Sequence, residues 1–483
     1  MFWLGSATLG ARIIDVVTSI VVLRVLTGAE LGLATLALTV SAFLEGFNSL
    51  GINNVIIQRA KLSDEEIASV WWYVLAVALA MTLGLMLAAP WIARLYGAVE
   101  LTQLIRLAAL KLVFVGLASV PLALLNRRLR FREVGAVMAG ATLLSSTLTI
   151  ALASTGAGAA APLVGTTAHG VFQFLGTCLF GFYRPRARFS WAHVAPMARD
   201  GLQLAGAVSI GQLTRNVDYL VLGKVVGLSL LGTYRVAFDL AMAPALVVMQ
   251  VVNRASLPIY SRISGEGAAL SPAFARTLRL VALLLIPALL IAALDGEILF
   301  DLLDKAHAGD IGVVIAGLCL AAWLRGLSQC TPVLLMASGH PTRALLQAVT
   351  SASLLGVTLV LGLAVWSDRD PLLVAACAWI ASSALQLAVD FALSRGSVRL
   401  RTGEWMKAIG VPLCVAVVTV VVAVTVHRVL DADLPAVAVA VDAAVVLAVY
   451  ALLLRYGLGV RGLRELRPKR DQGQDLEPGP GGG

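Results

Sequence analysis

Recurrent apolar segments limit most strongly what this chain can fold into. The 483 residues contain run after run of mostly apolar residues, each long enough, at about 20 residues, to cross a bilayer as a helix. Hydrophobic residues make up 59% of the chain and charged residues 13%, against roughly 45–50% and about 25% in soluble globular proteins. So little polar surface cannot cover a water-soluble globule. We therefore expect an integral membrane protein without a large soluble catalytic domain.

The apolar segments predict an all-α fold with about fourteen transmembrane helices. Each segment is bounded by polar residues, glycine or proline, as is typical of helices that end at a membrane surface. The first is interpreted as a helix and not as a signal peptide, because Arg12, Asp15 and Arg24 interrupt it. The expected limits are 2–26, 30–57, 67–95, 101–125, 134–154, 158–182, 200–225, 229–259, 273–300, 310–337, 343–367, 370–394, 406–428 and 434–456.

Lysine and arginine are concentrated in alternate connecting segments, which predicts the orientation. Arg127–Arg132 and Arg455–Arg470 lie in two of these segments, whereas the stretch 295–310, on the opposite side, is acidic. Because short cytoplasmic loops retain positive charge, both termini are expected to be cytoplasmic. The net charge of +9 then follows from topology, so no nucleic-acid partner is expected.

Three sequence echoes indicate an internal repeat. Arg12-Ile-Ile-Asp15 in the first predicted helix corresponds to Arg215-Asn-Val-Asp218 in the seventh. Leu31-Gly32 corresponds to Leu231-Gly232, and in that register Asn53 falls on Asn253 and Asn54 on Arg254. Val115-Gly116-Leu117 corresponds to Arg325-Gly326-Leu327. Six helices per repeat is an even number, so both halves enter the membrane from the same side, as in alternating-access transporters built from two bundles.

The repeat predicts the domain organisation. The expected parts are an N-terminal six-helix bundle at 1–183, a cytoplasmic linker at 184–199, a second six-helix bundle at 200–396, two additional helices at 397–457 and a tail at 458–483. The tail is basic and then rich in proline and glycine, so it cannot bury apolar surface and is expected to be disordered.

Ionisable residues inside the predicted helices are the candidate functional residues. A charge at the bilayer centre costs at least about 2.5 kcal/mol, so such groups are expected to face one another or a water-filled cavity. Bases outnumber acids, which predicts a cationic cavity for an anion, and the planar fork of arginine suits phosphate oxygens. The bases are Arg12, Arg24, Arg106, Lys111, Arg215, Lys224, Arg235, Arg254 and Arg325, and the acids are Asp15, Glu45, Asp218, Asp239 and Asp390.

Many of these charges also have a purely structural interpretation. Arg12 and Asp15 stand three residues apart on one helix, as do Arg215 and Asp218, so each pair can neutralise itself. Arg235 and Asp239, four residues apart, can do the same. Bases near helix ends can extend to the membrane surface at little cost. Both interpretations stay open for each residue.

A polar face on the second predicted helix extends the candidate site. Glu45, Asn48 and Asn53 follow one another at helical spacing, so they either line a hydrophilic cavity or hydrogen-bond to neighbouring helices. The five cysteines and five histidines are scattered, so no metal site is predicted. The spacing of Ser, His and Asp suggests no catalytic group, so an enzyme is not expected.

Several motifs together resemble the polysaccharide-exporting flippases of the multidrug, oligosaccharidyl-lipid and polysaccharide exporter superfamily. The resemblance covers roughly residues 1–400, and the paired halves make it fairly specific. The motifs are Phe2-Trp3-Leu4 through Arg12-Ile-Ile-Asp15, Leu23-Arg24-Val-Leu-Thr-Gly-Ala-Glu-Leu-Gly32, Leu125-Asn-Arg-Arg-Leu-Arg-Phe131, Asp218-Tyr219-Leu-Val-Leu-Gly223-Lys224 and Leu231-Gly-Thr-Tyr234-Arg-Val-Ala237.

The resemblance implies a flippase of the bacterial cytoplasmic membrane. Its substrate would be an undecaprenyl-diphosphate-linked oligosaccharide, moved from the cytoplasmic to the outer leaflet for surface polysaccharide synthesis. Membrane lipids, a polysaccharide polymerase and glycosyltransferases are the other partners it implies. The expected cavity residues, for diphosphate and sugar, are Arg12, Asp15, Arg24, Glu45, Asn48, Asn53, Arg215, Asp218, Lys224, Asn253, Arg254 and Arg325.

Two other functions remain as alternatives. A cation-coupled multidrug antiporter of the same superfamily would use Asp15 or Asp218 as its coupling acid. A membrane glycan polymerase or ligase would need a long outward loop, yet the longest candidate, around 295–310, is short and acidic. No cofactor is expected, and the sequence does not distinguish Na⁺ from H⁺ as a coupling ion.

Overall fold

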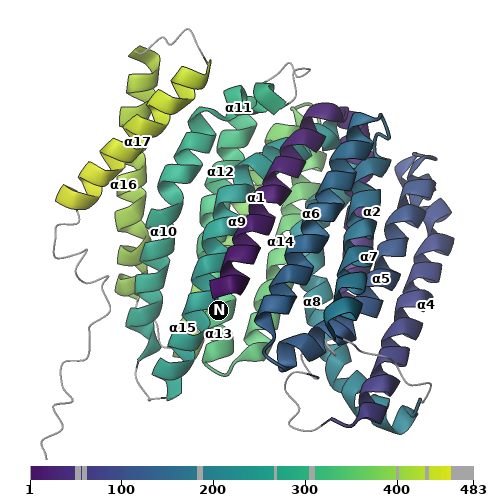
Figure 1. Cartoon of the computed structure of the whole chain (residues 1–483). Coiled ribbons are helices and arrows are strands. Elements are labelled where there is room, and N and C mark those ends of the chain that lie inside the picture. Colours follow the sequence, from purple (N-terminus) through teal and green to yellow (C-terminus); the bar gives the residue numbers. More distant parts are fainter. Residues whose placement is uncertain are drawn as a thin grey trace, which may run out of the picture.

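The computed structural model describes residues 2–48, 56, 62–181, 189–265, 269–303, 310–398, 402–429 and 435–457. Within these ranges the regular secondary structure is entirely α-helical (Figure 1). The helices are α1 (Phe2–Val25), α2 (Gly28–Asn48), α4 (Asp64–Tyr96), α5 (Leu101–Arg127), α6 (Phe131–Ser154), α7 (Ala160–Gly181), α8 (Trp191–Val225), α9 (Leu228–Gly265), α10 (Leu270–Leu294), α11 (Gly296–Leu303), α12 (Ile311–Ser328), α13 (Cys330–Ala337), α14 (Pro341–Val365), α15 (Pro371–Val398), α16 (Thr402–Val429) and α17 (Pro435–Gly457).

The expected all-α membrane fold is confirmed. Every one of the fourteen predicted segments contains a helix, and eleven helices of the described ranges are long and apolar enough to span a membrane. The predicted segment 273–300 is wrong as a single helix, and the predicted segment 310–337 contains one interruption. The segment 273–300 breaks at Asp295, before Gly296, a pair of residue types that favours a turn. The segment 310–337 remains one candidate span, Ile311–Ala337, and is interrupted only at Gln329, where Pro332 lacks the amide hydrogen that would continue the helical bonding.

Other boundaries also differ from the expected ones. α8 begins at Trp191, so part of the predicted linker at 184–199 is helical. α2 ends at Asn48, and the rest of the predicted segment 30–57, except Ile56, lies outside the described residues, as does the predicted tail at 458–483.

The start of α4 shows how a local side chain sets a helix boundary. Ser63 and Glu66 form a capping box at the start of α4, which satisfies backbone N–H groups that have no partner within the helix.

The described helices pack in two groups, which we call the first and the second bundle. In the first bundle α1, α4, α5, α6 and α7 pack side by side, and α2 joins them against α5. In the second, α9, α10, α12 and α15 pack together, and α14 connects α15 to α8. α16 and α17 pack on α10 and lie at one edge of the molecule, with α4 at the opposite edge (Figure 1). The two C-terminal helices are therefore peripheral.

The two bundles meet along α2, which packs against α8 and α9. The contact is reciprocal: Gly32 on α2 lies against the backbone of Leu228, and Gly232 on α9 lies against the backbone of Gly28. A Cβ atom at Gly32 or at Gly232 would collide with the facing carbonyl oxygen, so only glycine allows this approach. Gly28 and Gly32 stand 200 positions before Leu228 and Gly232. The two halves of the contact are therefore related by a pseudo-two-fold axis. The predicted repeat of Leu31-Gly32 and Leu231-Gly232 therefore has a structural role.

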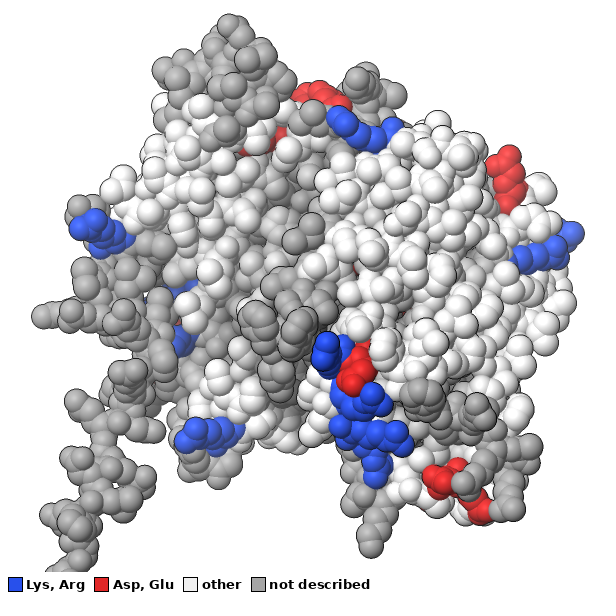
Figure 2. Space-filling model, viewed as in Figure 1, with Lys and Arg blue, Asp and Glu red and all other residues white. Residues whose placement is uncertain are grey.

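Charge is distributed unequally between the two ends of the bundle. Figure 2 shows lysine and arginine side chains gathered at the lower end of the view, most densely near the junction of α5 and α6. That junction carries Arg127, Arg128, Arg130 and Arg132. The end at which α10 meets α11 instead carries Asp295 and Glu297. These two sites therefore differ in charge in the sense that the sequence predicts.

Candidate functional site

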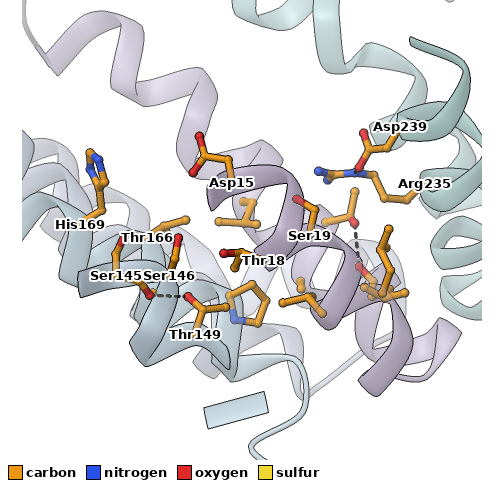
Figure 3. Close-up of a pocket in the computed structure, with 18 of the residues that line it drawn as sticks. Asp15, Thr18, Ser19, Ser145, Ser146, Thr149, Thr166, His169, Arg235 and Asp239 are labelled. Carbon is orange, nitrogen blue, oxygen red and sulfur yellow. Dashed lines mark hydrogen bonds and ion pairs between the residues drawn. The ribbon is translucent and has the colours of Figure 1, made fainter. Parts of the chain in front are cut away.

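The larger of two adjoining cavities lies where the bundles face each other and has a volume of about 300 Å³. Five helices of the first bundle contribute to it, and α9 contributes Arg235 and Asp239 from the second bundle. Figure 3 shows hydroxyl side chains of α6 and α7 on one side, residues of α1 in the middle, and Arg235 with Asp239 opposite. The polar lining residues are Asp15, Thr18, Ser19, Thr35, Lys111, Ser145, Ser146, Thr149, Thr166, His169, Arg235 and Asp239.

The second cavity, of about 270 Å³, adjoins the first at Lys111 and His169, which line both. Lys111 on α5 forms an ion pair with Glu45 on α2, with 2.8 Å between Nζ and Oε2. The two side chains are 20% and 29% exposed, so water still reaches them. This pair joins two helices of the first bundle, with Lys111 lining both cavities and Glu45 lining the second one.

On the opposite wall, the C-terminal bundle contributes one ion pair within α9. Arg235 Nε lies 2.6 Å from Asp239 Oδ2, as the four-residue spacing predicts. The guanidinium also lies over the ring of Tyr219, 5.4 Å from its centroid, a favourable cation–π arrangement. Both contacts orient the arginine at the cavity wall, where its remaining N–H groups can meet an anion.

Behind this wall, the second bundle is filled by an aromatic and polar network. Asp218 on α8 is fully buried, and its Oδ2 accepts a hydrogen bond of 2.7 Å from the Tyr234 hydroxyl. That hydroxyl accepts a bond of 2.7 Å from Trp379 Nε1. Arg325 lies over the Trp379 ring at 4.6 Å and interacts electrostatically with Asp218. The network holds α8, α9, α12 and α15 together.

The structure places the sequence-predicted site residues in different surroundings. Asp15 lines the larger cavity and Glu45 the second one, whereas Asp218 lies in the buried network with Arg325. Arg24 and Lys224 are exposed at helix ends, and Lys224 donates a hydrogen bond to the Leu95 carbonyl. Asn253, on α9, has a buried Oδ1 without a partner among the described residues. The structure describes the backbone but not the side chains of Arg12, Asn48, Arg215 and Arg254, and Asn53 lies outside the described residues.

Basic and acidic residues both line the larger cavity. Among its described lining residues, Lys111 and Arg235 stand against Asp15 and Asp239, so the signs balance. The predicted surplus of positive charge therefore rests on Arg12, Arg215 and Arg254 and stays a prediction, as does a substrate-binding role for each candidate residue. In the described ranges, no group of three or more His, Cys, Asp or Glu side chains could hold a metal ion.

Sequence reasoning missed several lining residues. His169 is one of five scattered histidines, and the hydroxyl residues of α6 are not among the expected cavity residues. Lys111, Arg235 and Asp239 are embedded charges outside the set of expected cavity residues. The signal that could have found them is the polar side of α6, where Ser145, Ser146 and Thr149 recur at helical spacing within an otherwise apolar segment.

Comparison with known proteins assigns the family. A family model described as polysaccharide biosynthesis protein matches residues 21–303. The lipopolysaccharide biosynthesis protein WzxC of Escherichia coli (strain K12) is 26% identical over 343 residues, which cover 70% of this chain and 69% of that protein. The succinoglycan biosynthesis transport protein ExoT of Rhizobium meliloti (strain 1021) is 27% identical over 285 residues, which cover 59% of this chain and 58% of that protein.

A solved structure supports the same grouping at the level of the fold. The lipid II flippase MurJ, in an inward closed conformation, superposes with a TM-score of 0.76 at 15% identity and covers 96% of this chain and 100% of that chain. The resemblance to polysaccharide-exporting proteins is thus confirmed, in fold by this superposition and in sequence by the family model. Since that model matches more than half of the sequence, the chain belongs to the polysaccharide biosynthesis protein family.

Proposed function

We propose that this protein moves a lipid-linked oligosaccharide across the cytoplasmic membrane for the synthesis of a surface polysaccharide. The substrate is an undecaprenyl diphosphate that carries an oligosaccharide repeat unit. The observation that carries the proposal is a polar cavity, with Lys111 and Arg235 in its walls, between the two bundles of a chain that belongs to a polysaccharide biosynthesis family. The relatives WzxC and ExoT, named for lipopolysaccharide biosynthesis and succinoglycan transport, support it.

The proposed mechanism separates the two parts of the substrate. The charged and hydroxylated headgroup enters the cavity, while the apolar tail stays in the bilayer, since burying a charge in hydrocarbon is costly. Arg12, Arg24, Arg215 and Arg254 are the proposed phosphate partners, with Arg235 as an addition from the structure. The two bundles then rock against each other, so that the cavity opens to one side at a time.

We also propose that the basic end of the bundle faces the cytoplasm. Short cytoplasmic loops retain lysine and arginine, and the described ends of the molecule differ in this way. The substrate then enters from the glycosyltransferases on the cytoplasmic side and leaves toward a polymerase on the outer side. Transport, and not a chemical step, is the proposed activity of this chain.

Deletion of the gene in its own strain tests the proposal. Lipid-linked oligosaccharide should accumulate inside the cytoplasmic membrane, and surface polysaccharide should fall severalfold. A plasmid copy of the gene should restore both. As a control for general membrane damage, sensitivity to a panel of cationic drugs should stay unchanged.

The opposite result distinguishes the antiporter alternative. If the deletion raises drug sensitivity while surface polysaccharide remains normal, and the strain has no second gene of this family, the proposed function is wrong.

A further inference from the structure

Hydroxyl side chains are the most numerous polar side chains in the lining of the larger cavity, and the charged candidate residues do not account for them. Seven serine and threonine side chains from four helices line it, a set we call the hydroxyl wall. The wall consists of Thr18, Ser19, Thr35, Ser145, Ser146, Thr149 and Thr166.

Most of these hydroxyls already use their proton within the protein. Thr18 donates to the Ile14 carbonyl at 2.8 Å, and Thr35 donates to the Leu31 carbonyl at 2.7 Å. Ser145, Thr149 and Thr166 likewise donate to carbonyls of their own helices. A hydroxyl has one proton and two lone pairs, so these oxygens can only accept a further hydrogen bond. These five oxygens therefore suit a ligand that donates.

The α6 part of the hydroxyl wall is held rigidly. Ser145, Ser146 and Thr149 are 7%, 6% and 7% exposed, so neighbouring helices enclose all but their cavity-facing side. At Gly165 on α7 a Cβ atom would collide with the Thr149 hydroxyl, so glycine at this position allows α7 to pack against it. Figure 3 shows Ser145, Ser146, Thr149 and Thr166 together on one side of the cavity.

The chemistry of the cavity favours a neutral polyol over an organic cation. A cation needs an acid without a base beside it, yet Asp239 is paired with Arg235, and Lys111 lines the same cavity as Asp15. A sugar ring carries several hydroxyl donors in a compact, uncharged frame, which matches an acceptor-rich surface. A volume of about 300 Å³ is at the small end for ligand pockets, so the cavity takes one end of an oligosaccharide in this conformation.

We propose that the hydroxyl wall binds the glycan part of the substrate, with sugar hydroxyls donating to the side chains of α1, α2, α6 and α7. This inference rests on the proposed function and adds to it. The second bundle provides Arg235 for the phosphates, and the first bundle provides the surface that recognises the sugar. The wall is then the part of the chain that distinguishes one repeat unit from another.

A comparison of two lipids tests the inference. The probes are undecaprenyl diphosphate and the undecaprenyl-diphosphate-linked oligosaccharide extracted from the deletion strain, each titrated against the full chain in lipid nanodiscs. Thr149→Val should weaken binding of the sugar-bearing lipid about three- to tenfold, the effect of one lost hydrogen bond, and leave undecaprenyl diphosphate unaffected. Thr147→Val is the matched control, because Thr147 donates to the Leu143 carbonyl of the same helix but is exposed outside the cavity.

Ser146→Ala provides a second, smaller change in case Thr149→Val does not fold, and it should show the same selective loss. If both variants bind both lipids as tightly as the wild type, or lose both equally, the hydroxyl wall only packs helices and the inference is overturned while the proposed function stands. If the wild type binds neither lipid, the proposed function itself fails, and the inference fails with it.

Discussion

The Tyr234 hydroxyl connects three helices through one donated and one accepted hydrogen bond. It donates to the buried carboxylate of Asp218 on α8 and accepts from Trp379 on α15. A buried carboxylate that loses a donor keeps its full desolvation penalty, so this bond matters more than a bond between neutral groups.

Replacement of Tyr234 by phenylalanine should therefore lower the free energy of unfolding by about 1–3 kcal/mol. Thermal unfolding of the purified protein in detergent measures the change. Tyr96→Phe is the matched control, since the Tyr96 hydroxyl donates only to a neutral carbonyl, that of Leu220, at 3.1 Å. If the two variants lose the same free energy of unfolding, the bond to the Asp218 carboxylate stabilises the protein no more than a bond to a neutral carbonyl.

The ion pair between Lys111 and Glu45 should give a measurable coupling free energy. A double-mutant cycle with Lys111→Met and Glu45→Gln should give a coupling free energy of about 1–2 kcal/mol, because both side chains are less than one-third exposed. The Arg130–Glu133 pair, at 2.9 Å within one helix end, is more open to water and should give a smaller value. If the free-energy changes of the Lys111 and Glu45 variants simply add in the double variant, the ion pair does not stabilise the protein.

At the scale of elements, the crossing of α2 and α9 controls how the two bundles meet. Gly32 and Gly232 bring the starts of these helices into backbone contact at the end where α1 joins α2. We expect this crossing to separate when the cavity opens toward that end, because the two helices lie in different bundles. The contact is therefore expected to act as a closed gate.

A cross-link across this contact should stop transport. A Cβ atom at Gly28 would lie 3.4 Å from the Ser229 Oγ, the position that a cysteine Sγ would take, so we expect Gly28→Cys and Ser229→Cys to form a disulfide. In a chain without its five native cysteines, oxidation of this pair should abolish the surface polysaccharide that the reduced variant supports, and reduction should restore it. Each single-cysteine variant is the control. Normal polysaccharide with the pair cross-linked would exclude a gate here.

At the scale of the whole molecule, the membrane fixes more of the fold than any local signal. Helix positions were predictable because a bilayer demands apolar segments of one length and sorts basic loops to one side. The repeat was predictable because Leu31-Gly32 and Leu231-Gly232 keep the same backbone contact. The helix breaks at Asp295 and Gln329 were missed, since apolar side chains continue on both sides of each break.

The candidate site was less predictable, because it depends on which helices become neighbours. Asp15 and Asp218 occupy matching positions of the repeat, yet Asp15 lines a cavity and Asp218 is buried beneath Tyr234. Lys111 finds its partner Glu45 across two helices, a pairing that no spacing along the chain reveals. In the sequence, Ser145 and Thr149 look like ordinary helix residues. They become cavity-lining residues only because α1 and α7 pack beside them.

Reconstitution tests the central claim most directly. The purified chain is inserted into vesicles with a fluorescent undecaprenyl-diphosphate-linked oligosaccharide in both leaflets, and a membrane-impermeant reagent then quenches the label on the outer face. With protein present, we expect quenching to proceed beyond the outer-leaflet half toward completion, because the protein keeps moving the headgroup across. Quenching that stops at about half, as in vesicles without protein, would contradict transport of this substrate by this chain.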